Sequence, residues 1–172
     1  EWLKLLIKYG FSIVKNSPIE KKSAFKILNR ISHIRETFFK TPFEVKNIPK
    51  PNNAAYTSAR LFNHTDLPFF EYAPGYQFLH CLINESNGGN SSVVDGYAVA
   101  DYIKKNIPKI FNQLISTPIN FKDNDYTQNK IRSISSPIIT LDKNKDYSDI
   151  RFNISTVGAF NINPNKMKKY YS

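Results

Sequence analysis

The sequence predicts an α+β domain that is mostly β, with short amphipathic helices beside its strands. Residues 97–107 carry apolar side chains at helical spacing, with Lys104 and Lys105 on the opposite face. Two short β-prone runs, 136–141 and 149–153, are separated by a polar turn. The length of 172 residues is typical of one domain and is enough to bury a core.

The N-terminal part is predicted to alternate helix and strand. Apolar residues within 1–9 fit a short amphipathic helix that ends at Gly10. A strand is expected at 11–14. A second helix is expected at 19–32, with Pro18 at or near its first turn.

The middle of the chain is predicted to be extended. The mostly apolar run 75–84 is expected to be a strand buried on both faces, with His80 and Cys81 packed inside it. Polar residues 123–128 are expected to form a surface loop, which lacks the ligand spacing and glycine of a calcium-binding EF-hand. The other expected elements are an extended segment at 34–39, strands at 43–45 and 91–95, connectors at 47–53 and 85–90, a helix at 108–115, an extended segment at 117–121 and a helix after Pro164.

The formal net charge of +10 does not predict nucleic-acid binding, because the basic residues are mostly dispersed lysines. They cluster only at 104–105 and 166–169, where a solvated helix face explains them. The absence of a run of eighteen apolar residues and of a secretory leader predicts a soluble protein with no membrane partner. A single cysteine, Cys81, favours the reducing cytoplasm. Because the chain opens on Glu1 and stops at Ser172 in helix-like sequence, we expect a fragment.

The candidate catalytic motif is His64-Thr65-Asp66. In a strand, residues two apart point to the same face, so the imidazole of His64 and the carboxylate of Asp66 could converge on one metal ion. Two histidines and one carboxylate form the facial triad of non-haem Fe(II) oxygenases, which leaves coordination positions open. A three-residue pattern also occurs without any metal, so the motif alone leaves both interpretations open.

Blocks around this motif occur in a characteristic order, at 54–57, 68–70, 74–82 and 88–96. Together they resemble the γ-butyrobetaine hydroxylase and trimethyllysine hydroxylase branch of the 2-oxoglutarate-dependent dioxygenases, over nearly the whole chain. The resemblance implies a double-stranded β-helix, a jelly-roll-like, clavaminate synthase-like core with flanking helices, truncated at its C-terminus. Residues 1–172 would be the N-terminal and central part of a TauD/TfdA-like catalytic domain that uses Fe(II), 2-oxoglutarate and O2.

The same resemblance assigns roles to single residues, with His64 and Asp66 as catalytic iron ligands. Ser91 and Asn53 match positions that help to seat 2-oxoglutarate, although Ser91 could equally be a strand-opening serine that faces water. Positions that surround the substrate, including aromatic walls for a trimethylammonium group, are matched by Phe39, Phe43, Tyr56 and Asn153. Two aromatic residues near a core could also be simply core.

Some expected features depart from the family pattern or are missing. Leu67 stands where relatives carry Tyr or a polar residue, and Ile154 stands where they usually carry a second Asn. The second iron-binding histidine and the arginine that pairs with 2-oxoglutarate are expected beyond Ser172, because His33 and His80 do not match ligand positions.

The resemblance therefore implies hydroxylation of a small amino-acid-derived substrate, with γ-butyrobetaine to carnitine first. The alternatives are a dioxygenase of the same fold acting on a sulfonate, an aryloxy acid or trimethyllysine, and a non-catalytic binding module with a decayed site. The isolated fragment is expected to be inactive, and a homodimer is one expected assembly of the full-length protein.

Overall fold

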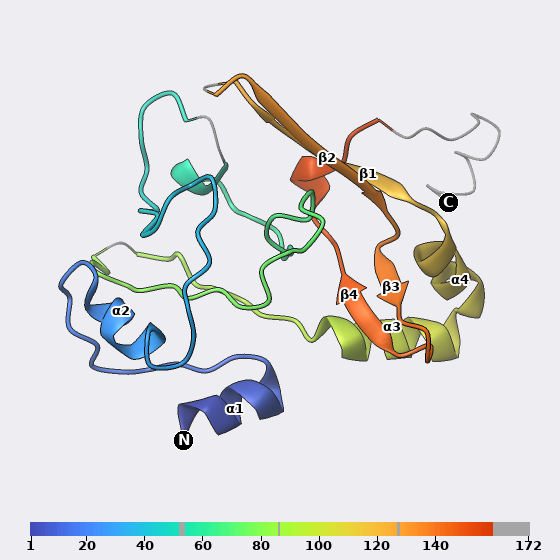
Figure 1. The fold of residues 1–172 in the computed structure, drawn as a ribbon, viewed down its shortest axis with the longest axis horizontal. Helices are drawn as coiled ribbons and strands as arrows, with labels where there is room; N and C mark the ends of the chain where they lie inside the picture. Colours follow the sequence, from blue (N-terminus) through green and yellow to red (C-terminus); the bar gives the residue numbers. More distant parts are fainter. Residues whose placement is uncertain (52–53, 86, 127, 160–172) are drawn as a thin grey trace. The chain divides into compact units, whose positions relative to one another are not determined.

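The computed structural model describes residues 1–51, 54–85, 87–126 and 128–159, and these divide into two compact units (Figure 1). The first unit comprises Glu1–Lys46 and Pro74–Ser92, and the second comprises Asn47–Ala73 and Val93–Ser172. Within the described ranges the chain combines α-helices with small antiparallel sheets, which confirms the α+β part of the predicted class. The prediction of a mostly β domain is not borne out there, because the helices contain more residues than the strands.

The first unit contains two short helices. Helix α1, Trp2–Tyr9, ends at Gly10, whose φ of 75° is the left-handed conformation that glycine adopts without steric cost. This helix was predicted correctly. Helix α2, Ser23–Leu28, is much shorter than the predicted 19–32. Lys22 has a φ of 74°, which ends the helix on its N-terminal side, and Ser23 Oγ donates a hydrogen bond to the Pro18 carbonyl (2.8 Å).

No strand occurs among the described residues of the first unit, so the strands predicted there are wrong. A strand needs a neighbour whose N–H and C=O groups pair with its own, and hydrophobic sequence alone does not supply one. Leu79 and Ile83, predicted to be buried, are 73% and 76% exposed, and Cys81 is exposed as well. The wrong strand predictions are 11–14, 43–45, 75–84 and 91–95, the last of which continues into the second unit.

The second unit opens its helical part with a capped helix. Helix α3, Gly96–Asn106, is preceded by Asp95, whose carboxylate accepts hydrogen bonds from the N–H groups of Tyr97 and Ala98 (3.0 Å each). Helix α4, Pro108–Ser116, has its proline in the first turn, where a missing N–H costs nothing. Both helices were predicted within one residue.

Two antiparallel pairs follow (Figure 1). Strand β1, Ile119–Asp125, pairs with β2, Lys130–Ser136, so part of the loop predicted at 123–128 is strand. Strand β3, Ile139–Leu141, pairs with β4, Tyr147–Ile150, which confirms the predicted strand pair. The bounds differ, because β3 is shorter than predicted and β4 begins two residues before the predicted 149–153 and ends at Ile150. Two 3-10 helices complete the described elements, η1 at Ala54–Tyr56 and η2 at Ile154–Thr156.

The core of the second unit lies where α3 and α4 pack on β3 and β4. Ala100, Phe111 and Ile139 are buried at its centre. The inward face of α3 runs through Ala100 and Ile103, whereas Val99 and Tyr102 are 44% and 64% exposed. The contact between α3 and β4 is close, because a Cβ added at Gly96 would lie 3.2 Å from Ile150 Cδ1.

The predicted jelly-roll barrel is not visible in the described ranges, where each of the two sheets has two strands. Within the same ranges, no helix has both the length and the apolar character that crossing a bilayer requires.

Candidate active site

His64 and Asp66 lie in an irregular loop of the second unit and not in a strand, so the strand geometry considered for the motif does not apply. Their side chains nevertheless meet, because His64 Nε2 lies 3.3 Å from Asp66 Oδ1. Leu67, with a φ of 52°, adopts a left-handed conformation directly after Asp66. The side chains of His64 and Asp66 are 31% and 41% exposed, which leaves both within reach of an ion from solvent.

The imidazole of His64 is oriented by its other nitrogen. Nδ1 lies 2.6 Å from the Phe62 carbonyl oxygen. A carbonyl can only accept, so Nδ1 is the donor, and in the neutral ring Nε2 then carries the free lone pair. A histidine that donates one ring N–H to a backbone carbonyl and turns its other nitrogen outward is the arrangement usual for metal ligands.

The spacing of His64 Nε2 and Asp66 Oδ1 fits two ligands of one divalent metal ion. Two ligand atoms at about 2.1 Å from one ion and at right angles to each other lie about 3 Å apart, close to the observed separation of Nε2 and Oδ1. Two lone pairs facing each other repel unless a cation or a proton lies between them. The alternative is therefore an ion pair between Asp66 and a protonated His64, and a metal competes with that proton.

The described part of the chain supplies only these two ligands, since it contains no group of three His, Cys, Asp or Glu residues that could hold a metal. His80 lies in the first unit, where its Nε2 is 2.8 Å from the Pro18 carbonyl. That bond satisfies the imidazole of His80, as predicted, although the buried strand expected to carry it is not formed.

The predicted substrate and co-substrate residues are distributed over both units. In the first unit the rings of Phe39 and Phe43 lie 4.6 Å apart, and Ser91 is exposed in irregular chain. In the second unit Tyr56 ends η1, and Asn53 lies outside the described residues.

Asn153 is the predicted residue that the structure joins to the motif. Its amide Nδ2 donates to the carbonyl oxygen of Thr65 (3.4 Å), the residue between His64 and Asp66. Its Oδ1 accepts from the Ser155 N–H (3.1 Å) and caps η2. The amide of Asn153 is thus engaged by the chain at both ends.

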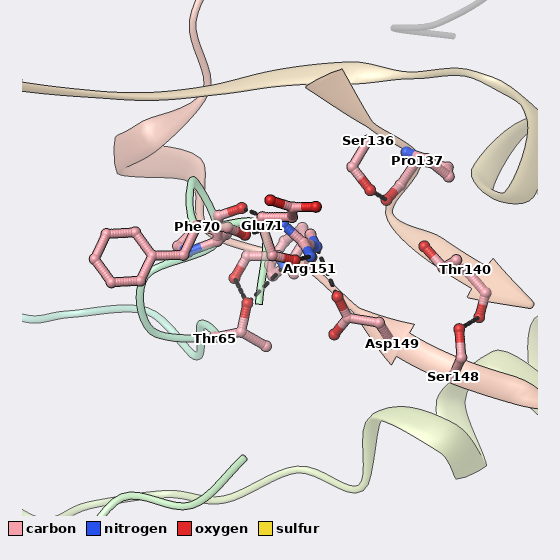
Figure 2. Close-up of polar contacts among 11 residues, drawn as sticks. Thr65, Phe70, Glu71, Ser136, Pro137, Thr140, Ser148, Asp149 and Arg151 are labelled. Atoms are coloured by element: carbon pink, nitrogen blue, oxygen red, sulfur yellow. Dashed lines mark hydrogen bonds and ion pairs between the residues drawn. The ribbon is translucent and has the colours of Figure 1, made fainter. Parts of the chain in front are cut away.

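Arg151 was not predicted, although it forms the most extensive set of contacts around the motif (Figure 2). It is 7% exposed, pairs with Asp149 and donates to three carbonyl groups of the loop after Asp66. A signal was available in the sequence. Asp149 and Arg151 stand two residues apart at the end of a short β-prone run, where opposite charges on one face indicate an ion pair.

The family model described as "Taurine catabolism dioxygenase TauD, TfdA family" matches residues 1–170. The chain belongs to the TauD/TfdA family. Its similarity to γ-butyrobetaine dioxygenase from Pseudomonas sp. is 34% identity, over 99% of this chain and 44% of that protein. The human γ-butyrobetaine dioxygenase is 32% identical over the whole chain and 45% of the relative.

A trimethyllysine dioxygenase from Meyerozyma guilliermondii is 28% identical, over 99% of this chain and 44% of that relative. The chain therefore spans about half the length of the curated TauD/TfdA relatives it matches.

Proposed function

We propose that the protein with its natural termini, called the full protein below, is an Fe(II)- and 2-oxoglutarate-dependent dioxygenase. The observation that carries the proposal is the 3.3 Å separation of His64 Nε2 and Asp66 Oδ1, with the imidazole oriented by the Phe62 carbonyl, in a chain of the TauD/TfdA family. On this proposal residues 1–172 are part of one catalytic domain with a double-stranded β-helix core, acting in the cytoplasm.

In this proposal His64 and Asp66 supply two iron ligands, and a second histidine beyond Ser172 supplies the third. When bound, the iron supplies the activation of O2 and the oxidation of 2-oxoglutarate that accompany hydroxylation. The chain's own contribution is geometric. The Phe62 carbonyl keeps the Nδ1 proton of His64 in place, so that Nε2 faces Asp66 and remains available as a ligand.

The proposed co-substrate contacts come from Ser91 and Asn53. The Ser91 hydroxyl can donate one hydrogen bond to a carboxylate of 2-oxoglutarate, and its exposure leaves it available for that role. An asparagine at 53 can donate through its amide to the same anion.

We further propose γ-butyrobetaine as substrate, because the relatives from Pseudomonas sp. and human are γ-butyrobetaine dioxygenases. Its trimethylammonium group would be attracted to the faces of Phe39 and Phe43, whose rings lie together. Tyr56 and Asn153 are proposed as further substrate contacts on the basis of the family resemblance. The alternative substrates are trimethyllysine, a sulfonate or an aryloxy acid. Leu67, which departs from the family pattern, is the feature that keeps a sulfonate or an aryloxy acid open.

The test is removal of either ligand in the full protein. His64→Ala or Asp66→Ala should reduce 2-oxoglutarate turnover to less than about a tenth and weaken Mn(II) binding, because too few ligands then remain. His80→Ala is the matched control and should retain most activity, since His80 bonds to the Pro18 carbonyl. More than a tenth of activity in either ligand variant would contradict the assignment. Failure of the unmutated full protein to bind either Mn(II) or 2-oxoglutarate would instead indicate a decayed binding module.

A further inference from the structure

Arg151 is a buried charge with a complete set of partners, all in the second unit (Figure 2). Its Nε donates to Asp149 Oδ2 (2.6 Å). Nη1 donates to the carbonyls of Pro68 (2.9 Å) and Phe70 (2.6 Å), and Nη2 to the carbonyl of Glu71 (2.7 Å). A buried guanidinium is tolerated when its charge is paired and its nitrogens are hydrogen-bonded. Here the charge is paired with Asp149, and each of the three guanidinium nitrogens donates at least one hydrogen bond.

The three carbonyls belong to the turn that directly follows Asp66. Leu67 adopts a left-handed conformation, and the N–H of Phe70 closes the turn on the Leu67 carbonyl (3.0 Å). No strand or helix pairs residues 67–71, so Arg151 takes the place of a neighbouring strand in satisfying their carbonyls. One planar group thus cross-links three successive parts of the loop.

The other side of the motif is attached to the residue next to Arg151. The N–H of Thr65 donates to the Phe152 carbonyl (2.7 Å), and the N–H of Phe152 donates to Thr65 Oγ1 (2.9 Å). Asp66 therefore lies between two attachment points, Thr65 and Pro68. Thr65 is hydrogen-bonded to Phe152, and Pro68 to Arg151. The backbone N–H of Arg151 in turn donates to the Ile138 carbonyl beside β3 (2.8 Å).

We propose that Arg151 is a positioning residue, which holds the loop after Asp66 so that the Asp66 carboxylate stays beside His64 Nε2. The part of this inference that concerns metal affinity rests on the proposed function. The part that concerns the loop does not, because it follows from contacts within the chain. Arg151 touches neither side chain of the motif in these contacts and acts through the backbone of residues 68–71.

The planar fork is the property that matters, and lysine lacks it. Arg151→Lys keeps the charge but offers one rotating ammonium, which cannot reach a carboxylate and three carbonyls together. In the metal-free full protein, hydrogen exchange at the Thr65 N–H should become at least about tenfold faster, while exchange in α3 stays unchanged. Mn(II) affinity should fall by about 10- to 100-fold, the usual effect of losing a group that orients a ligand.

Arg132→Lys is the matched control, because Arg132 pairs with Asp123 (3.0 Å) and Asp125 (3.6 Å) in the β1–β2 hairpin. It should change neither Thr65 exchange nor Mn(II) affinity. If Arg151→Lys speeds exchange throughout the second unit, the test is repeated with Asp149→Asn. This variant removes only the carboxylate charge that pairs with Arg151 Nε. A two- to tenfold faster exchange of the Thr65 N–H in that variant, with exchange in α3 unchanged, supports the positioning role.

An unchanged exchange rate of the Thr65 N–H in Arg151→Lys overturns the inference. If exchange in Arg151→Lys is faster throughout the second unit, an unchanged Thr65 rate in Asp149→Asn overturns it. A full protein that binds no Mn(II) before mutation overturns the proposed function instead. The exchange experiment still tests the loop in that case, so the two failures are distinguishable.

Discussion

The two units differ in what holds them together. All the buried hydrophobic side chains of the described ranges lie in the second unit, at Phe69, Ala100, Phe111, Ile119, Phe121 and Ile139. In the described ranges of the first unit, the buried residue is Ser23, at 8% exposure. Ile7, Ile13, Leu79 and Ile83 in that unit are each more than 70% exposed. Similar apolar sequence therefore forms a packed core only where helices and paired strands enclose it.

The largest expected effect is on the free energy of unfolding, when an isoleucine is replaced by alanine in each unit. Ile139→Ala should lower the free energy of unfolding of the full protein by about 2–5 kcal/mol, because Ile139 is 3% exposed and its removal leaves a cavity. Ile83→Ala, at 76% exposure, should change it by less than about 0.5 kcal/mol. Urea denaturation measures both, and equal effects would show that the two units are equally packed in the full protein.

A smaller effect is expected at the aromatic cluster of the first unit, where function should change more than stability. Phe43→Leu keeps apolar bulk but removes the ring quadrupole, so the KM for γ-butyrobetaine should rise about 3- to 30-fold, or ~0.7–2 kcal/mol. Uncoupled 2-oxoglutarate turnover should hardly change, and Phe78→Leu serves as a control, since Phe78 contacts Trp2 instead. If γ-butyrobetaine fails to stimulate the unmutated enzyme and a substrate without a cationic head succeeds, the proposed cage is wrong.

The smallest effect is expected in alkaline solution. The hydroxyl of Tyr147 on β4 donates to Asp101 Oδ1 on α3 (2.6 Å), and this hydrogen bond, with burial and the charge of Asp101, raises the pKa of Tyr147 to about 12. A raised pKa means that the folded state favours the neutral hydroxyl. The stabilisation is complete below pH 10 and is lost as the pH rises towards 12. It should be below about 1 kcal/mol because the pair is near solvent.

Tyr147→Phe should flatten that alkaline loss of stability in denaturation curves, whereas Tyr76→Phe in the first unit should leave it in place. If the free energy of unfolding depends on pH in the same way in Tyr147→Phe and in the unmutated protein, the hydrogen bond between Tyr147 and Asp101 does not contribute to stability.

The elements that the sequence predicted correctly depend on local signals. Asp95 caps α3 and Pro108 begins α4, and both act within one turn of chain. Strand predictions failed at 11–14 and 75–84, because strand formation depends on a partner that a single segment does not reveal. Strand β2 was missed because its apolar residues, Ile131 and Ile134, do not alternate with polar ones. Its less exposed face is formed by Arg132, Ile134 and Ser136, two of which are polar.

The candidate site was predictable in its residues but not in its construction. The proximity of His64 and Asp66 was inferred from strand geometry, but the two residues lie in a loop. That loop is shaped by the left-handed conformation of Leu67 and by the hydrogen bonds between Thr65 and Phe152. Those contacts join residues more than eighty positions apart. Neither periodicity nor a short motif carries that information, and the roles of Ser91, Asn53 and the aromatic residues stay predictions.

The close approach at Gly96 links the choice of amino acid at two distant positions. A methyl group there would meet Cδ1 of Ile150 at 3.2 Å, and Cγ2 of the same side chain only at 3.9 Å. Valine lacks the δ carbon, so an alanine at 96 becomes compatible with α3–β4 packing when 150 is valine. The two positions are expected to vary jointly rather than independently, and a change at 96 alone would press on the residue that precedes Arg151.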